Sequence, residues 1–126
     1  MKFEPPKSPE KMNEKFASAY NSGILENLNL LFEHDAKVSK HDGSIISGYK
    51  NYNSEHKNLL KLGGKMTSTN KFCIQFEDIA LLKAEWKIET ENENGEKIVI
   101  NGTSSEVVRK QNNGDWLYII DNPFSS

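Results

Sequence analysis

The chain has 126 residues, 36% hydrophobic and 27% charged, with 16 Lys and Arg against 18 Asp and Glu and a formal net charge of −2. This length predicts one domain with a core and room for one small pocket, which excludes two catalytic domains. The charge balance offers no basic surface for phosphate and argues against nucleic-acid binding. No apolar stretch approaches the roughly 18 residues of a membrane helix, and the first ten residues lack a signal peptide's apolar run. We therefore expect a cytoplasmic protein without membrane contact.

The chain begins with a polar, proline-containing segment, residues 1–7, which we expect to be a flexible lead-in to a single domain at 8–126. Ser8 and Pro9 then supply an N-cap hydroxyl and a proline at the first helical position. Apolar residues recur at three- and four-residue steps from there to Gly23, where this helix should end.

The same spacing continues from Leu25 to Phe32 and predicts a short second helix that stops before His34. It should pair with the first helix in an antiparallel manner across a tight turn. Weak alternation over residues 36–41, followed by the turn dipeptide at 42–43, then predicts a short strand.

A third helix is predicted from Ser47 and Gly48 to the glycine pair at 63–64. The period changes to two from Lys65 onward, which predicts a strand up to Phe76. Three further strands are expected at about 79–91, 97–111 and 115–122, separated by turn residues. Helices followed by an antiparallel meander define an α+β fold in which three N-terminal helices cover one face of a strongly curved, mostly antiparallel sheet.

Strand register can be predicted from the hairpin loops, because a slip of one residue moves every side chain to the other face. Three-residue loops at 77–79 and 94–96 and a four-residue loop at 111–114 place apolar residues on one face. The predicted rows across that helix-facing side are Ile74, Leu82, Val108 and Leu117; then Phe72, Ala84, Glu106 and Ile119; then Asn70, Trp86, Ser104 and Asp121.

The second row carries one carboxylate, Glu106, among apolar side chains, and Asp121 lies diagonally across from it on the next strand. A buried acid is costly unless it is paired or neutralised, so an inward Glu106 indicates a cavity. Two such carboxyls would titrate apart and could serve as catalytic proton donor and acceptor. The alternatives are that Glu106 pairs with a helix residue, that the register is different, or that Asp121 bonds the backbone at the strand end.

Five other side chains are candidates for ligand contact, and four of them have a structural alternative. Trp86 opposite Ser104 could stack on a planar ligand or belong to the core, and Asn70 could bind ligand, Trp86 or water. Tyr20 could reach the cavity or fill the core, and His56 could overlook its opening or be solvated. The single cysteine and the spacing of the histidines predict no metal site and no cofactor.

Several segments in order resemble the SnoaL-like, ketosteroid-isomerase-like branch of the nuclear transport factor 2-like (cystatin-like) superfamily. The matching segments are Tyr20-Asn-Ser-Gly-Ile24, Leu31-Phe-Glu-His-Asp-Ala-Lys-Val38, Ser47-Gly48, and the tail from Val108 to Phe124, which is similar to the ending of uncharacterised bacterial members. The resemblance implies a cone-shaped fold with a pocket at its wide end, usually in a dimer.

The resemblance does not carry the isomerase machinery onto this chain. The position of the oxyanion tyrosine falls on Phe16, which has no hydroxyl and would serve only as a ligand-binding wall, and the position of the base falls on Lys40. The position of the protonated acid falls on Glu106, the one acidic member retained. Steroid isomerisation by the known mechanism is therefore not expected, because it needs both a base and an oxyanion donor.

Two classes of function remain open, and whether the protein is an enzyme is not decided by its sequence. One is a small pocket protein that binds a small apolar or carbonyl-containing molecule; the other is an acid–base enzyme of isomerase, cyclase or hydratase type using Glu106 and Asp121. A non-catalytic protein-association module is a further alternative. A homodimer is expected because Trp116, Tyr118 and Ile120 should make the outer sheet face apolar as well.

Overall fold

The computed structural model describes residues 2–125, which form three α-helices, one short 3-10 helix and one six-stranded sheet. The elements in chain order are η1 (Pro9–Lys11), α1 (Met12–Ser22), α2 (Leu25–Asn29), β1 (Phe32–Ser39), β2 (Ile45–Ser47), α3 (Tyr49–Leu60), β3 (Lys65–Phe76), β4 (Ile79–Glu91), β5 (Lys97–Lys110) and β6 (Trp116–Ser125). The sheet order is β2-β1-β6-β5-β4-β3, with β1 and β6 parallel and the other neighbours antiparallel. The predicted α+β fold is confirmed.

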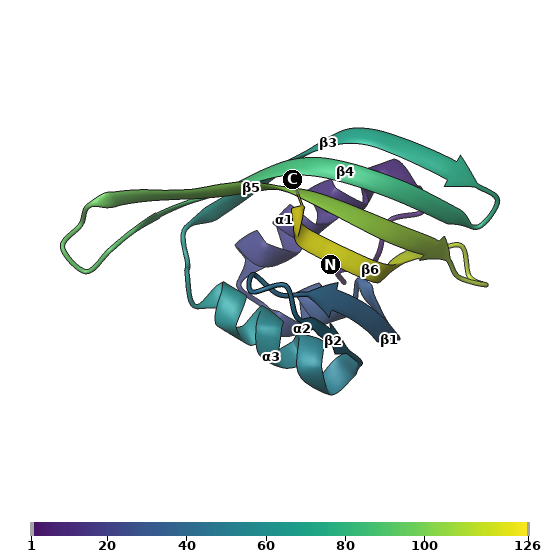
Figure 1. Ribbon diagram of the computed structural model, residues 1–126, viewed down its shortest axis with the longest axis horizontal. Coiled ribbons are helices and arrows are strands. Elements are labelled where there is room, and N and C mark those ends of the chain that lie inside the picture. Colours follow the sequence, from purple (N-terminus) through teal and green to yellow (C-terminus); the bar gives the residue numbers. More distant parts are fainter. Residues whose placement is uncertain (1, 126) are drawn as a thin grey trace.

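The long strands β3, β4 and β5 arch over the helices, and the β4–β5 hairpin extends beyond them (Figure 1). α1 packs against β3, while α2 packs against α3 on the side of β1 and β2. This arrangement encloses the space between the concave sheet face and the helices. None of the helices in the described part of the chain is long and apolar enough to cross a membrane.

The first helix begins at Pro9 with a 3-10 turn and ends at Gly23, whose φ of 71° is the left-handed conformation that glycine tolerates. The second helix is shorter than predicted: it ends at Asn29, and Phe32 opens β1 instead of closing the helix. The apolar residues at 31 and 32 are buried in the core, so their spacing reflected burial and not a continuing helix. The predicted strand at 36–41 is therefore the second half of β1.

The register predicted for β3 and β4 is wrong. The turn has two residues, Glu77 and Asp78, so that Phe76 pairs with Ile79, and the pairing shifts again at a β-bulge between Asn70 and Phe72. A bulge adds one residue and reverses which face the following side chains occupy. The inner face therefore holds Met66, Ser68 and Asn70 as predicted, but Phe72, Ile74 and Phe76 are exposed on the outer face.

The pairings of β4 with β5 and of β5 with β6 also differ from the prediction. Leu82 pairs with Glu106, and Glu106 pairs with Asp121, so the two acids lie directly opposite each other and not diagonally. The turn between β5 and β6 is one residue shorter than predicted, because the Gln111 N–H already donates to the Asp115 carbonyl, and this reverses the face of the first residues of β6. An irregularity between Val107 and Val108 then shifts the pairing again, so that Asp121 lies inward as predicted. Trp116 and Tyr118, which were expected on the outer face, are buried in the core at 2% and 1% exposure.

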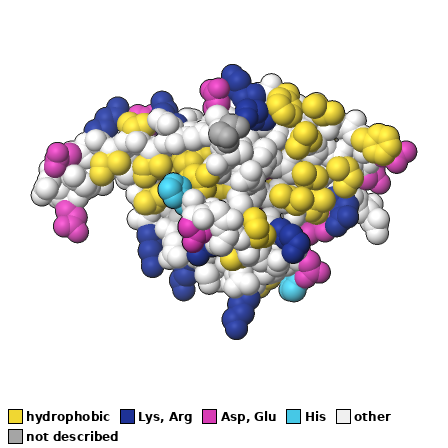
Figure 2. Space-filling view, viewed as in Figure 1, with side chains coloured by type: hydrophobic (Ala, Val, Ile, Leu, Met, Phe, Trp, Pro, Cys, Tyr) yellow, Lys and Arg dark blue, Asp and Glu magenta, His cyan; other side chains and the backbone are white. Residues whose placement is uncertain are grey.

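The outer sheet face carries an apolar row made of residues paired across four strands. These residues are Ile74, Leu81, Val107 and Ile120, with Phe72, Phe76 and Leu117 beside them; we call this set the outer patch. Figure 2 shows hydrophobic side chains gathered over the sheet near the β3–β4 turn. Phe76 and Ile74 are 75% and 61% exposed, so the described chain leaves this face uncovered.

The lead-in is attached to the domain by several contacts, two of which lie at the start of β6. The carbonyl of Pro6 accepts a hydrogen bond from the Trp116 backbone N–H at 3.0 Å. The Lys7 ammonium lies 2.6 Å from the Asp115 carboxylate. The end of this segment is thus joined to the start of β6.

Candidate functional site

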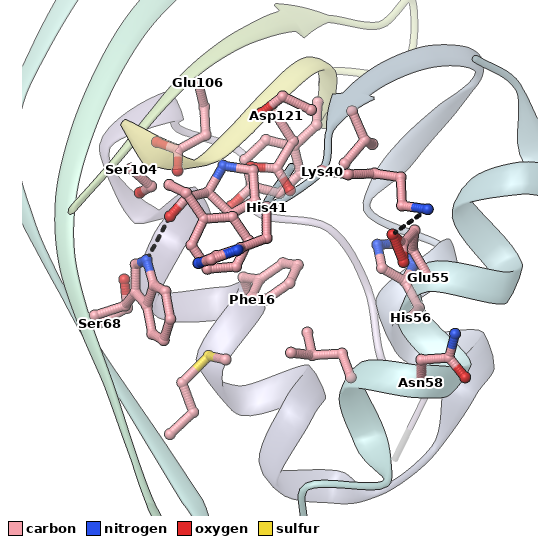
Figure 3. A pocket seen from close by; sticks show the side chains of 18 of the residues that line it. Phe16, Lys40, His41, Glu55, His56, Asn58, Ser68, Ser104, Glu106 and Asp121 are labelled. Carbon is pink, nitrogen blue, oxygen red and sulfur yellow. Dashed lines mark hydrogen bonds and ion pairs between the residues drawn. The ribbon is translucent and has the colours of Figure 1, made fainter. Parts of the chain in front are cut away.

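A cavity of about 470 Å³ opens between the concave sheet face, α1, α3 and the turn after β1. Figure 3 shows side chains from these elements converging on it, with Glu106 and Asp121 on one side and His56 on the other. Its lining residues are Asn13, Phe16, Val38, Ser39, Lys40, His41, Asp42, Glu55, His56, Asn58, Leu59, Leu62, Met66, Ser68, Trp86, Ser104, Glu106, Tyr118, Asp121, Pro123 and Phe124. The wall is mainly apolar, with the polar groups in a few places, as is usual for small-molecule sites.

The sheet wall of the cavity carries a pair of buried acids. Glu106 on β5 and Asp121 on β6 are cross-strand partners, and they are only 3% and 8% exposed. Cross-strand partners have Cβ atoms about 5 Å apart, so the two carboxyls share one small volume. No ion pair with Lys or Arg involves either acid within residues 2–125.

Asn13 on α1 holds Glu106 in place from the helix side. Its amide nitrogen donates to Glu106 Oε1 and to Asn70 Oδ1, both at 3.0 Å. Its amide oxygen accepts from the Tyr118 hydroxyl at 2.8 Å. Both amide hydrogens of Asn13 are therefore used within the protein, and none remains for a ligand.

Burial makes both acids favour the neutral form. Desolvation raises the pKa of Glu106 to about 7, although hydrogen bonds from Ser104 and Asn13 act in the opposite direction. Desolvation, together with repulsion from Glu106, raises the pKa of Asp121 well above its usual value. The pair therefore holds at least one proton at neutral pH and can present a carboxyl O–H to the cavity.

Trp86 forms an aromatic wall beside the acids. An added Cβ at Gly102, its partner on β5, would lie 3.0 Å from Trp86 Cζ2, so the indole lies against the bare glycine backbone. The indole N–H donates to the Pro123 carbonyl at 2.7 Å, and Phe124 meets the ring edge-on with centroids 5.7 Å apart. The orientation of Trp86 is thus set on both sides.

His56 on α3 lies in an aromatic cluster with Phe16, Phe32 and Tyr52, with ring centroids 4.6 to 6.2 Å away. Its Nδ1 lies 2.8 Å from Asn29 Oδ1. Burial lowers the pKa of His56 to about 4, so the ring is neutral at pH 7.

The opening of the cavity is more polar. Lys40 lies 3.9 Å from Glu55 on α3, and His41 meets Phe124 edge-on at 4.8 Å between centroids. Among residues 2–125, Lys40 is the one Lys or Arg that lines the cavity, and the carboxylate of Glu55 balances its charge. The cavity therefore offers no free cation to a charged acid.

Six of the eight residues proposed from the sequence line this cavity: Phe16, His56, Trp86, Ser104, Glu106 and Asp121. Tyr20 and Asn70 do not. The Tyr20 hydroxyl donates to the Gly63 carbonyl at 2.7 Å and joins α1 to the end of α3. Asn70 lies behind Asn13, to which its amide oxygen is bonded.

Sequence reasoning missed Asn13 and Tyr118, which connect the acids to the core. Asn13 lies three residues before Phe16, on the buried side of α1 between Met12 and Ala17. A polar residue at a position whose spacing predicts burial could have marked it as a site residue. Tyr118 was missed because the turn before β6 is one residue shorter than predicted, which reverses the face of the first residues of β6. The residues of the opening, 39–42, come from the end of β1 and the turn after it, which the sequence predicted as a turn but not as part of the site.

No family model matches the sequence, and no curated protein matches it. Solved structures do match in fold. A protein of Xanthomonas campestris named for the calcium/calmodulin dependent protein kinase II association domain has a TM-score of 0.76 at 14% identity, covering 100% of this chain and 97% of its own. A ketosteroid isomerase-like protein of Erwinia carotovora atroseptica has a TM-score of 0.74 at 14% identity, covering 90% and 91%.

A domain of unknown function with a cystatin-like fold from Nostoc punctiforme has a TM-score of 0.73 at 16% identity, covering 90% of this chain and 72% of its own. The chain therefore has the cystatin-like, nuclear transport factor 2-like fold that the sequence resemblance implied. Identities this low concern the fold alone, and function has to be argued from the cavity.

Proposed function

We propose that the cavity binds a small, uncharged, flat molecule with a carbonyl group. The observation that carries this proposal is the pair of buried, cation-free acids, Glu106 and Asp121, at the sheet wall of a mainly apolar cavity. A protonated carboxyl is a hydrogen-bond donor, and a carbonyl oxygen is its simplest neutral acceptor. An anionic ligand is disfavoured, because the pair becomes negative when it ionises and Lys40 is already neutralised by Glu55.

The flat shape follows from Trp86. Its ring is fixed by Gly102 on one side and by the Pro123 carbonyl at its N–H, so it offers a rigid apolar surface next to the acids. A planar ligand can cover such a ring without any rearrangement of the protein. Phe16 provides a second aromatic side chain from the helix side of the cavity.

Fluorescence titration with two compounds of the same ring system tests this proposal. We expect 2-acetonaphthone, a neutral ketone, to quench Trp86 and to bind at least tenfold more tightly than 2-naphthoate, its carboxylate counterpart. Trp86→Phe should remove the quenching and weaken ketone binding, whereas the remaining tryptophan, Trp116, is buried in the core and serves as an internal reference. Equal or tighter binding of the naphthoate, or no saturable binding of either compound, would contradict the proposal.

A second candidate function is acid–base catalysis on the bound carbonyl compound, and the pKa of Glu106 near 7 favours it. One carboxylate would remove a proton from the carbon next to the carbonyl while the protonated partner donates to the oxygen, giving an enol that takes back a proton. In deuterated buffer the methyl hydrogens of 2-acetonaphthone would then exchange for deuterium. We expect NMR to detect faster exchange with the protein than with Glu106→Gln, and equal rates would leave a binding protein only.

We also propose that the chain assembles as a homodimer through the outer patch. The support is the exposure of its large apolar residues on the sheet face opposite the helices. A protein-association role through the same face is the alternative to self-association. The corresponding test is given with the whole molecule below.

A further inference from the structure

The orientation of the His56 ring is fixed by a chain of side chains on its outer side. Asn29 donates from Nδ2 to Asn53 Oδ1 at 2.6 Å, which directs its own amide oxygen toward His56 Nδ1 at 2.8 Å. An amide oxygen can only accept, so Nδ1 carries the proton of the neutral ring. The lone pair of the imidazole is therefore on Nε2.

Nε2 has no hydrogen-bond partner. Among the buried side-chain nitrogen and oxygen atoms of residues 2–125, it is the one without a partner, in a residue only 4% exposed. The two nitrogens point away from each other across the ring, so Nε2 lies on the edge away from Asn29. His56 lines the cavity, and Figure 3 shows it on the α3 side, across from Glu106 and Asp121.

A buried, unpartnered acceptor has a specific reason in most proteins. Phe16, Phe32 and Tyr52 surround the His56 ring with aromatic rings. Burial also keeps the ring neutral at pH 7, because the pKa of His56 is lowered to about 4. A neutral acceptor at one wall and a carboxyl donor at the opposite wall give the cavity a fixed polarity.

We propose that His56 Nε2 accepts a hydrogen bond from a hydroxyl or N–H group of the molecule bound in the cavity. This inference rests on the proposed function and narrows the ligand class to molecules with a donor at the α3 end and a carbonyl at the sheet end. A planar hydroxyketone is the simplest such molecule.

The test compares two ketones that differ by one hydroxyl. 6-Hydroxy-2-acetonaphthone carries a donor at the end of the ring system opposite the carbonyl, and 2-acetonaphthone lacks it. We expect the hydroxyketone to bind the wild-type protein about tenfold more tightly, the effect of one buried hydrogen bond that would otherwise be missing.

His56→Asn is the matched variant, because its amide can replace Nδ1 toward Asn29 while it has no atom at the position of Nε2. Thermal unfolding checks that the variant is folded. We expect the ratio of the two affinities to fall from about ten to about one, whatever the change in the affinity for 2-acetonaphthone itself. A tenfold preference that persists in His56→Asn would overturn the inference.

Nitrogen-15 NMR of the wild-type imidazole decides the question even if the variant does not fold. The hydroxyketone should shift the Nε2 resonance of His56, whereas 2-acetonaphthone should leave it close to its free value. Equal affinities and no Nε2 shift, with both ketones still bound, would overturn this inference and leave the proposed function standing. Binding of neither ketone would contradict both.

Discussion

Glu106, Asp121 and His56 are three ionisable side chains whose pKa values burial shifts in favour of the neutral form. The pKa of Glu106 is raised to about 7, that of Asp121 is raised well above its usual value, and that of His56 is lowered to about 4. Charged ligands are poorly matched to such groups, whereas neutral donors and acceptors fit them. The proposed preference for neutral ligands therefore depends on burial. In solvent the two acids would lose their protons, and the histidine would more readily gain one.

Glu106→Gln should remove part of the pH dependence of stability. A raised acid pKa means that the folded state keeps its proton while the unfolded chain loses it, so stability is full below about pH 4.5 and falls as pH rises to about 7. The loss is on the order of 3 kcal/mol, at 1.36 kcal/mol for each unit of pKa difference. Gln has the same size and keeps the acceptor for Asn13 Nδ2.

Urea unfolding at several pH values measures this effect. We expect Glu106→Gln to match the wild type near pH 4 and to be the more stable protein at pH 7.5. His56 has the opposite effect on stability, because its lowered pKa makes the folded state more stable as pH rises. Both proteins contain His56, so its contribution cancels when the stability of the variant is compared with that of the wild type. A variant that is less stable than the wild type at pH 7.5 would show that an ionised, well-paired glutamate holds the structure.

Gly102→Ala should disturb the position of Trp86. The added Cβ would lie 3.0 Å from Cζ2 and 3.2 Å from Cε2, tighter than most Cβ contacts in proteins, so the ring has to shift by a few tenths of an ångström. We expect a loss of about 1–2 kcal/mol in unfolding free energy and weaker ketone binding. Asn101→Ala, at the neighbouring exposed position, is the control and should change neither; equal behaviour of the two variants would contradict the close contact.

The candidate acids could be identified from the sequence, because an acidic residue inside an apolar strand pattern is unusual whatever the exact register. Asn13 and Tyr118 were not identified. Their function depends on a helix and a strand that are about 100 residues apart in the chain meeting at Glu106, and single-segment periodicity carries no such information.

The strands were predicted well in position and poorly in pairing. β4 has the predicted bounds, 79–91, but a bulge near Lys71 reverses the face of the end of β3, and a turn one residue shorter than predicted reverses the face of the start of β6. Alternation of apolar residues cannot reveal such a shift when both faces are partly apolar, as they are here. β2 was missed because three residues are too few to show a period.

The lead-in segment should stabilise β6, although the sequence alone predicted that it is flexible. Removing residues 1–7 would leave the Trp116 backbone N–H without Pro6 and Asp115 without Lys7. We expect unfolding free energy to fall by about 1–2 kcal/mol. Lys7→Ala, which keeps the backbone hydrogen bond, should cost under about 1 kcal/mol; a truncation with no effect on urea unfolding would show that this segment does not contribute.

The outer patch is a feature of the whole molecule, because it combines four strands on the face that the helices do not cover. The homodimer was first predicted from Trp116, Tyr118 and Ile120, and the first two of these are in the core. The expectation is now carried by Ile74, Leu81 and Ile120 and their neighbours in the patch.

Sedimentation at micromolar concentration should give twice the mass of the chain. Leu81→Lys together with Ile74→Lys should give the mass of one chain, because two charges at the centre of a dry contact are costly. Val99→Lys, at an exposed position on the distant β4–β5 hairpin, is the matched control and should remain dimeric. A wild type of single-chain mass would exclude the dimer.

The infrared carbonyl band of bound 2-acetonaphthone labelled with carbon-13 tests most directly whether the buried acid pair receives a neutral carbonyl. We predict that the band lies at lower frequency in the wild-type protein than in cyclohexane, because a carboxyl O–H donates to the oxygen. In Asp121→Leu it should return toward the cyclohexane value. A band that already has the cyclohexane frequency in the wild type, or one that Asp121→Leu leaves in place, would contradict this account of the cavity.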